Sequence, residues 1–236
     1  MADNDFAEFK SALIVGAGAG LSAALARVLT RAGLKVTLAS RTIDDLTALQ
    51  RETGAQAFAC DATKEAEVVN LFASLEHNGG APDVVVYNAS GRSRGPFIDL
   101  VPAEVEKAIA VSAFGGFLVA QQAARPMLRK GRGVIVFTGA SASVKGYAQS
   151  APFAMGKFAL RGLAQSMARE LAPQGIHVAH VVIDGGIKSA ARQDPPDKPA
   201  SFLDPDAIAA TYLHLIQQPR SGWAWEIELR PWVERF

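Results

Sequence analysis

The sequence predicts an α/β fold in which a doubly wound, Rossmann-type parallel sheet of about seven strands carries helices on both faces. Apolar runs of strand length alternate with longer segments of helical period, and 236 residues suit a single domain spanning residues 1–236. We expect strands at residues 12–15, 35–39, 55–60, 83–88, 133–138, 177–183 and 226–229. We expect helices at residues 21–32, 43–53, 64–76, 102–129, 152–172 and 205–217.

Composition and charge restrict the classes of partner. With 24 Lys and Arg against 23 Asp and Glu, the net charge is +1 and no basic stripe forms, so neither nucleic acid nor a membrane surface is an expected partner. The longest weakly polar run, residues 12–26, is shorter than the roughly 18 residues of a membrane helix. The acidic N-terminus lacks a signal-peptide pattern, and Cys60 is the only cysteine, which predicts a cytoplasmic protein. None of the four histidines falls in a motif, and no metal site is expected.

A glycine-rich turn follows the first predicted strand. It contains Gly16, Gly18 and Gly20, followed by Leu21 and Ser22 at the start of the first helix. Such glycines let the backbone approach a pyrophosphate, whose charge is met by free amides at the helix N-terminus. The pattern Gly-x-Gly-x-x-Gly is incomplete because position 21 is Leu, so a tight strand-to-helix turn is the alternative. Its position after the first strand favours phosphate binding.

The end of the second strand predicts the choice of dinucleotide. An acidic residue there would bind the ribose 2′-hydroxyl and favour NAD, but this chain has Ser40 and Arg41. A guanidinium and a hydroxyl suit a 2′-phosphate, so NADP(H) is expected over NAD(H). The alternative is that Arg41 is an ordinary solvated loop residue.

Two further motifs resemble a known family. The fourth strand ends in Tyr87-Asn88-Ala89-Ser90-Gly91, and a later helix carries Phe153-Ala154-Met155-Gly156-Lys157. Together with the glycine turn, these segments resemble the short-chain dehydrogenase/reductase family, in which Asn-Asn-Ala-Gly and Tyr-x-x-x-Lys occupy these places. The resemblance spans nearly the whole chain and implies an NAD(P)-binding oxidoreductase. It indicates a divergent branch, because Phe153 replaces the catalytic Tyr.

The resemblance implies further cofactor contacts. Asp61 and Ala62, after the third strand, match the adenine-binding position, although Asp61 could equally cap the next helix. Asn88 would hold neighbouring strand backbones together, with Ala89 and Ser90 against the adenosine. In the family, a Pro-Gly segment after the sixth strand closes over the nicotinamide. The residues that follow the sixth strand of this chain resemble that segment, and Gly185, Ile187 and Ser189 are expected to bind the cofactor.

The reactive residues of the family are mostly replaced. Lys157 is retained and is expected to bind the nicotinamide ribose, with an exposed helix lysine as the alternative. Ser112 stands where an Asn would support the proton relay. Ala140 takes the place of the carbonyl-binding Ser, and a small loop shift would bring the neighbouring Ser141 to the site.

One carboxylate is a candidate acid or base. Asp184 replaces the Pro of the Pro-Gly segment and is expected near the reactive ring, although a turn-stabilising role is the default. Tyr147 lies six residues before Phe153 and is judged a poor substitute acid because it falls off the helix face. The proline-containing segment 188–203 follows the sixth strand and is predicted to act as a substrate lid.

Two functions are consistent with these residues. The first is an NADP(H)-dependent oxidoreductase that transfers a hydride to or from a carbonyl, alcohol or enone, with its proton supplied through water, Ser141 or Asp184. The alternative is a catalytically inactive dinucleotide-binding protein that acts as a sensor or assembly partner. The small-molecule substrate cannot be read from the sequence.

The resemblance also implies self-association, as a homodimer or homotetramer formed through the helices at residues 102–129 and 152–172. The candidate interface residues are Phe114, Phe117, Leu118, Phe158, Leu160 and Leu163. The C-terminal segment, with Trp223, Trp225, Trp232 and Phe236, is too aromatic for a solvated tail. We expect it to pack on the core or, preferentially, on a neighbouring subunit.

Overall fold

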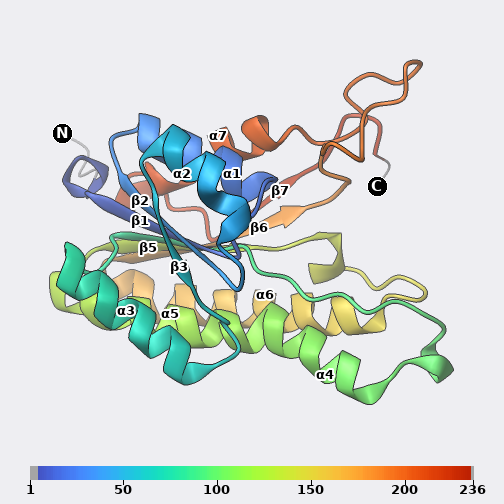
Figure 1. The fold of residues 1–236 in the computed structure, drawn as a ribbon, viewed down its shortest axis with the longest axis horizontal. Coiled ribbons are helices and arrows are strands. Elements are labelled where there is room, and N and C mark those ends of the chain that lie inside the picture. The colour runs from blue at the N-terminus through green and yellow to red at the C-terminus, as the bar shows by residue number, and fades with distance from the viewer. Residues whose placement is uncertain (1–4, 235–236) are drawn as a thin grey trace.

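The computed structural model describes residues 5–234, which form one sheet with helices on both faces (Figure 1). All neighbouring strands are parallel, in the order β3-β2-β1-β4-β5-β6-β7, and the predicted fold class is confirmed. The strands are β1 (Ser11–Val15), β2 (Lys35–Ser40), β3 (Gln56–Ala59), β4 (Val84–Tyr87), β5 (Gly133–Thr138), β6 (Ile176–Ile183) and β7 (Glu226–Leu229). Residues 1–4, Arg235 and Phe236 lie outside the described part.

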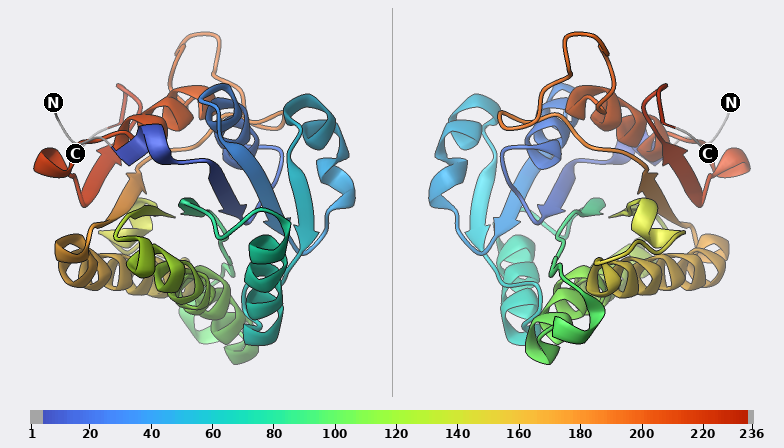
Figure 2. Two further views of the ribbon diagram at one scale, coloured as in Figure 1. Left: turned by 90° about the vertical axis from the view of Figure 1, so that its left-hand side faces the viewer. Right: turned by 90° about the vertical axis from the view of Figure 1, so that its right-hand side faces the viewer.

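The helices form two layers with the sheet between them (Figure 2). One layer contains α1 (Leu21–Arg31), α2 (Thr47–Thr53) and α7 (Pro205–Ile216), and the other contains α3 (Glu65–Asn78), α4 (Pro102–Ile109), α5 (Gly115–Lys130) and α6 (Ala151–Leu171). Successive strand residues point to opposite faces, so Ile14 joins the core under α1 while Leu13 and Val15 join the core under α5. Both faces of the sheet are therefore buried, as the continuous apolar strands require.

The long helix predicted over residues 102–129 is wrong in one respect, because the structure divides it. A π-helical turn, Ala110–Phe114, separates α4 from α5. The phenol of Tyr87 on β4 donates a hydrogen bond to the Val111 carbonyl at 2.6 Å, which gives that carbonyl a partner outside the helix. Burial raises the pKa of Tyr87, so the phenol is a neutral donor. π-Turns of this kind are frequent near functional sites, and this one carries Ser112.

The predicted interface residues divide into two groups. Phe114, Phe117 and Phe158 are exposed, and the rings of Phe114 and Phe117 stack with centroids 6.1 Å apart. Leu118 and Leu160 are buried in the protein's own core, so assigning them to an outer face was wrong. An α-helix of this fold presents one stripe to the sheet, and the sequence alone did not separate that stripe from the outer one.

The C-terminal aromatic residues mostly pack on their own chain. The Trp223 ring stacks on His177 with centroids 4.8 Å apart, and the Arg161 guanidinium lies 5.5 Å from the centre of the Trp225 ring. Trp232 is exposed and donates a hydrogen bond from Nε1 to the Pro199 carbonyl at 3.3 Å. The end of the chain is thereby tied to the 188–203 segment.

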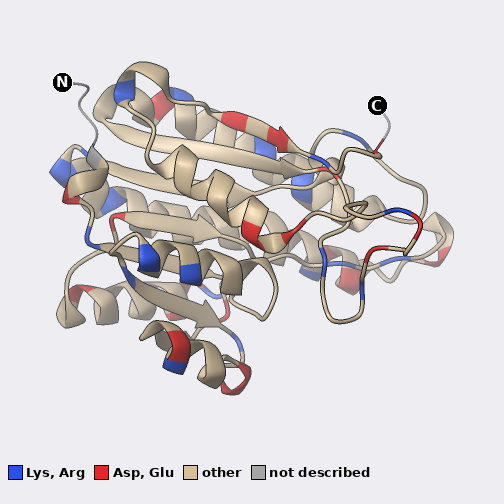
Figure 3. Ribbon diagram, turned by 90° about the horizontal axis from the view of Figure 1, so that it is seen from above, with Lys and Arg blue, Asp and Glu red and all other residues tan. Residues whose placement is uncertain are grey.

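Charged residues of both signs are interspersed over the described surface (Figure 3). Within residues 5–234, no helix is both long enough and apolar enough to cross a membrane.

Asp83 anchors the amino-terminal edge of the sheet, opposite the loops that form the site. Its Oδ2 accepts hydrogen bonds from the backbone N–H groups of Lys10, at 2.8 Å, and Ser11, at 3.3 Å. Its Oδ1 lies 3.1 Å from Nζ of Lys130 at the end of α5. One buried carboxylate therefore connects the start of β1 with the end of α5.

We expect Asp83→Ala to lower the free energy of unfolding by about 2 kcal/mol, because two backbone donors lose their acceptor in a buried place. Urea denaturation checks this, with Asp83→Asn as the control. The amide keeps one acceptor oxygen, so its effect should be smaller. Equal losses in the two variants would contradict the role of the lost acceptor.

Candidate active site

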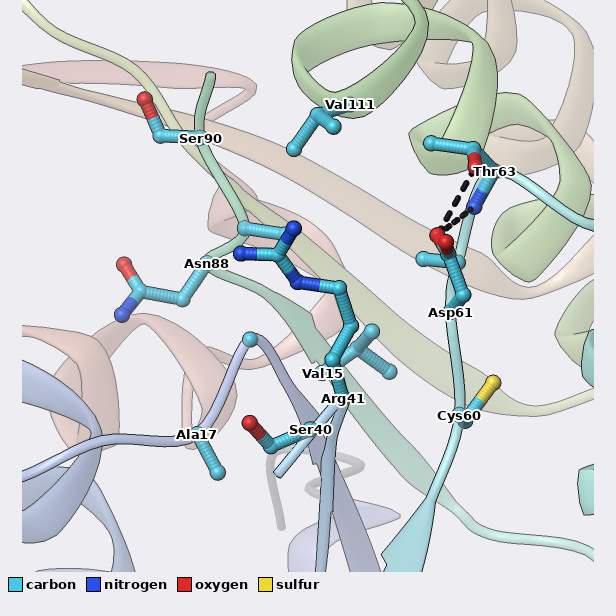
Figure 4. A pocket seen from close by; sticks show the side chains of 13 residues that line it. Val15, Ala17, Ser40, Arg41, Cys60, Asp61, Thr63, Asn88, Ser90 and Val111 are labelled. Carbon is cyan, nitrogen blue, oxygen red and sulfur yellow. Dashed lines mark hydrogen bonds between the residues drawn. The ribbon is translucent and has the colours of Figure 1, made fainter. Parts of the chain in front are cut away.

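The candidate cofactor cavity lies where strand order reverses in the sheet. Parallel strands β1 and β4 are neighbours, and the chain leaves their carboxyl ends toward opposite faces. A cavity of about 300 Å³ opens at this point (Figure 4). It is lined by Val15, Gly16, Ala17, Ser40, Arg41, Cys60, Asp61, Ala62, Thr63, Asn88, Ala89, Ser90 and Val111.

Gly16 allows the turns after β1 and β4 to touch. Its φ is +84°, and a Cβ placed there would lie 2.4 Å from the backbone nitrogen of Ala89. The hydroxyl of Ser22 donates to the Gly16 carbonyl at 3.0 Å and accepts from Nδ2 of Asn88 at 2.8 Å. Asn88 thus acts through Ser22 to hold the start of α1 against the turn after β4.

The glycine turn fits a pyrophosphate. A Cβ added to Gly18 or Gly20 would meet no atom within 4 Å, so the turn faces open space on that side. Helix α1 begins immediately afterwards, at Leu21, and its first amides have no partner within the helix. A helix N-terminus beside bare backbone is a suitable site for phosphate groups.

The adenosine side of the cavity combines a cation with a fixed carboxylate. Arg41 at the end of β2 reaches across the cavity, and Asp61 faces it from the end of β3 (Figure 4). The backbone N–H and hydroxyl of Thr63 both donate to Oδ1 of Asp61, at 3.0 and 2.8 Å. Burial raises the pKa of Asp61, but the two hydrogen bonds and the charges of Lys64 and Arg41 bring it below its usual value. Asp61 therefore caps the turn that precedes α3.

Cys60 lies in the wall of the same cavity. Burial raises the pKa of its thiol to about 11. The thiol is protonated near neutral pH and behaves as an apolar wall group.

A second cavity, of about 520 Å³, lies beyond the cofactor cavity at the same edge of the sheet. We call it the reactive cavity. Its walls come from the loops after β4, β5 and β6 and from the first turn of α6. It is lined by Arg92, Arg94, Ser141, Ala142, Tyr147, Ala148, Ser150, Phe153, Gly185, Gly186, Arg192 and Phe202.

Phe153 lies under a guanidinium at the wall of the reactive cavity. The Arg92 guanidinium carbon is 4.2 Å from the centre of the Phe153 ring, the distance of a cation–π contact. Nζ of Lys157 lies 5.9 Å from the same ring centre. The ring thus separates one exposed cation from one buried cation.

Lys157 is almost completely buried, with 2% of its surface exposed. Its Nζ donates to the Thr138 carbonyl at 2.7 Å, and the Thr138 hydroxyl accepts from the phenol of Tyr212 at 2.9 Å. Burial, and then the charge of Arg92, lower the pKa of Lys157 to about 7. Its alternative reading as an exposed helix lysine is wrong.

Comparison with known proteins identifies the family. The model of the short-chain dehydrogenase family matches residues 10–199. The chain belongs to the short-chain dehydrogenase family. A short-chain dehydrogenase from Rhodopseudomonas palustris is 33% identical, with a TM-score of 0.81 over 94% of this chain and 99% of that one.

Two other members are similar over nearly their whole length. An uncharacterized oxidoreductase of Staphylococcus aureus (strain N315) is 28% identical over 228 residues, which cover 94% of this chain and 97% of that protein. A metagenomic short-chain oxidoreductase in complex with NADP is 28% identical, with a TM-score of 0.82 over 94% of this chain and 97% of that one. The fold and the nicotinamide-dinucleotide-binding family are therefore established for this chain.

Two residues expected in the reactive group of this short-chain dehydrogenase make other contacts. Ser112 is fully buried, and its hydroxyl accepts from the Gly91 N–H at 3.1 Å and lies 3.4 Å from the Gly91 carbonyl. Asp184 is 2% exposed, and its Oδ2 lies 3.2 Å from Nζ of Lys145 and 3.3 Å from Nη2 of Arg230. Asp184 is therefore engaged in ion pairs with two cations and lines neither of the two cavities.

The segment after β6 has only part of the expected geometry. Gly185 lines the reactive cavity, whereas Ile187 packs against the core under α1 and Ser189 is exposed, in a turn with Arg192. The 188–203 segment, predicted as a substrate lid, contains no helix. It is closed by Asp194, which accepts from the N–H groups of Ala200 and Phe202.

Several residues of the reactive cavity were not predicted from the sequence, among them the polar residues Tyr147, Arg92, Arg94 and Arg192. Tyr147 was judged by helix periodicity, but it lies in the loop before α6, where that periodicity does not apply. The arginines belong to loops without a family motif. A signal for two of them was present in Arg92-Ser93-Arg94, a pair of cations directly after the Asn88 motif.

Lys157 predicts a specific pH dependence of stability. Its pKa is about 7 in the folded protein and near the ordinary 10.5 when unfolded, so the unfolded chain binds more protons between these values. The free energy of unfolding should therefore gain a contribution as pH rises from about 7 toward about 10. Lys157→Met should lack this contribution.

Urea unfolding of both proteins at about pH 6 and about pH 9 measures it. Because other groups titrate equally in the two proteins, the difference between their changes in unfolding free energy gives the contribution of Lys157. A wild-type gain no larger than that of Lys157→Met would contradict the lowered pKa.

Proposed function

We propose that this protein is an NADP(H)-dependent oxidoreductase that transfers a hydride to or from a carbonyl, alcohol or enone. The observation that carries the proposal is the placement of a phosphate-binding turn and a reactive cavity at one edge of the sheet. Gly16, Gly18 and Gly20 would hold the pyrophosphate. Lys157, whose Nζ lies 5.9 Å from the centre of the Phe153 ring, is the residue that the family resemblance assigns to the ribose. Bound NADPH supplies the hydride.

The preference for NADP(H) rests on Arg41. Its guanidinium reaches into the adenosine side of the cavity, where a 2′-phosphate would lie (Figure 4). The hydroxyl of Ser40 lines the same wall and adds a donor. The metagenomic relative in complex with NADP supports the same choice.

Arg41→Ala should weaken NADPH binding by about tenfold or more and leave NADH binding nearly unchanged, because only NADPH carries the 2′-phosphate. Isothermal titration of each dinucleotide measures both constants. Arg51→Ala, on the exposed end of α2, is the matched control. Tighter binding of NADH than NADPH by the wild-type protein would contradict the preference.

The proton comes from a group other than the Tyr of the family, because Phe153 stands at that position and has no acidic hydrogen. Tyr147 brings a phenol to the same cavity from the neighbouring loop. It interacts with Lys145, whose pKa is raised by its hydrogen bond to Asp184 and, to a smaller extent, by Tyr147. A phenol beside an ammonium group is the pairing that an acid of this kind requires.

We therefore assign the role of proton donor to Tyr147. The Ser141 hydroxyl would donate a hydrogen bond to the substrate oxygen. In reduction, the carbonyl carbon accepts the hydride and the carbonyl oxygen accepts the phenolic proton of Tyr147. The ammonium of Lys145 stabilises the phenolate, which takes a proton from water because 47% of Tyr147 is exposed. Asp184 serves by holding Lys145, and Ser112 by fixing Gly91.

Tyr147→Phe should lower kcat about 100-fold while leaving NADPH binding unchanged, because only the acid is removed. Steady-state NADPH oxidation with a panel of aldehydes, ketones and enones measures kcat. Adding Phe153→Tyr to the Tyr147→Phe variant should restore part of the rate, since it places a phenol beside Lys157.

Two outcomes would count against this route. Full activity of Tyr147→Phe would indicate that the proton comes from water or from Ser141 instead. If the wild-type protein oxidises no NADPH with any member of the panel and Phe153→Tyr gains turnover, the native chain is a dinucleotide-binding protein without catalysis.

We also propose that the protein forms a homodimer or homotetramer through α4, α5 and α6. Phe117 on α5, Phe158 on α6 and Phe114 in the π-helical turn between α4 and α5 have exposed rings, which support this surface. Aromatic residues are enriched at the buried centres of such interfaces.

A further inference from the structure

The reactive cavity is lined by three arginines. Arg92 and Arg94 come from the loop after β4, and Arg192 comes from the 188–203 segment. These segments are far apart in sequence, and the fold brings their guanidinium groups around one cavity of about 520 Å³. That volume suits a small molecule, because small-molecule sites typically enclose roughly 300 to 1,000 Å³.

No acidic side chain lines this cavity in the described part of the chain. Among residues 5–234, none of the three arginines forms an ion pair. Two nearby acids are paired with other cations: Asp184 with Lys145 and Arg230, and Asp194 with Lys188 at 2.7 Å. Glu104 lines the smaller cavity that shares Arg92, but not the reactive cavity. The wall of the reactive cavity itself therefore holds no counterion for its arginines.

The three guanidinium groups also repel one another. Burial, and then the charges of Arg94 and Arg192, lower the pKa of Arg92. Like charges held together in this way raise the free energy of the empty cavity, and an anion bound among them would relieve it. The cavity is thus better suited to an anion than to a neutral molecule.

Aromatic rings lie against two of the three arginines. Arg92 lies over the ring of Phe153 at 4.2 Å, and Arg192 lies 5.9 Å from the ring centre of Phe202. A guanidinium that stacks by its face keeps its N–H edge free for an oxyanion. Phe153 therefore has a function of its own, because its ring supports the Arg92 guanidinium at the wall of the reactive cavity.

These arginines are distinct from the one assigned to the cofactor. Arg41 lines the adenosine side, whereas Arg94 and Arg192 line only the reactive cavity. Arg92 lies between the two, in the walls of both the reactive cavity and a smaller one that also includes Arg41. An anion held by Arg94 and Arg192 is consequently a group of the substrate.

We propose that the substrate of this site carries an anionic oxygen group, a carboxylate or a phosphate, which Arg92, Arg94 and Arg192 bind while its carbonyl or hydroxyl faces Tyr147 and Ser141. This inference rests on the proposed oxidoreductase function. It adds the class of substrate, namely oxo acids, hydroxy acids or phosphorylated carbonyl compounds of small size.

Matched pairs of compounds test the proposal. Pyruvate is compared with methyl pyruvate, 4-carboxybenzaldehyde with its methyl ester, and dihydroxyacetone phosphate with dihydroxyacetone. Two readouts are used on the full chain: NADPH oxidation, and calorimetric binding of each compound to the protein saturated with NADP⁺. Saturation keeps the phosphate compound out of the cofactor cavity. The variants are Arg192→Gln and Arg94→Gln, with Arg51→Gln as the control on a remote surface.

In at least one pair, the anionic member should be favoured by about tenfold or more in kcat/KM and in binding, because a charge-assisted pair replaces a neutral contact. Arg192→Gln and Arg94→Gln should each reduce this preference, and Arg51→Gln should keep it. The carboxylate and phosphate pairs show which anion is preferred. Thermal unfolding of each variant verifies that it folds.

The outcomes separate this inference from the proposed function. Turnover with equal preference for anionic and neutral members would overturn the anionic site and leave the oxidoreductase. Arginine-dependent binding of an anion without any turnover would support the site and overturn hydride transfer. If no anionic member binds more tightly than its neutral partner, the inference is wrong.

Discussion

The turn after β1 lies against the turn after β4, with no room for a side chain between them. A Cβ at Gly16 would come within 2.6 Å of both the nitrogen and the Cα of Ala89. The strands themselves are in register up to Val15 and Tyr87, so the two turns leave the sheet side by side. The hydrogen bonds from Asn88 to Ser22 and from Ser22 to Gly16 then fix the start of α1 against β4. The depth and direction of the cofactor cavity follow from this backbone contact, and the reactive cavity is positioned relative to it.

A buried ammonium group sets the electrostatics of the adjoining region. Lys157 has Thr138 as its hydrogen-bond partner, while the charge of Arg92 acts on it across the Phe153 ring. Farther under the sheet edge, His180 and Arg161 both contact Glu226, and burial lowers the pKa of His180 to about 4 despite that carboxylate. The neutral imidazole adds no positive charge to this region, and the Glu226 carboxylate is paired with Arg161. A cofactor or substrate with acceptor oxygens is stabilised in such a place.

The sequence predicted the fold class and the order of strands and helices along the chain, because these depend on local patterns such as the alternation of apolar runs. Several of the residues predicted to bind the cofactor line one cavity, because they follow the carboxyl ends of neighbouring parallel strands. The reactive side was harder to predict, because its residues come from loops whose positions are set by tertiary contacts. Tyr147 and Arg192 reach one cavity from different loops, which no spacing rule encodes. The π-turn at Ser112 likewise depends on a phenol from β4, 24 residues earlier.

The family resemblance implies a phenol at the position of Phe153, and the plain ring found there has two related consequences. A plain ring offers its face to a cation, and Arg92 occupies that face, so the position that would have held an acid now supports a guanidinium. The phenol that remains near the cavity is on the loop after β5, and the backbone N–H of Gly95 donates to the Gln149 carbonyl of that loop at 3.3 Å. Arg92, Arg94 and Tyr147 are thus carried by two loops that are bonded to each other. For the proposed anionic substrate and proton route, the anchoring arginines and the phenol lie on connected loops, so we expect binding of the anion to orient the carbonyl toward Tyr147.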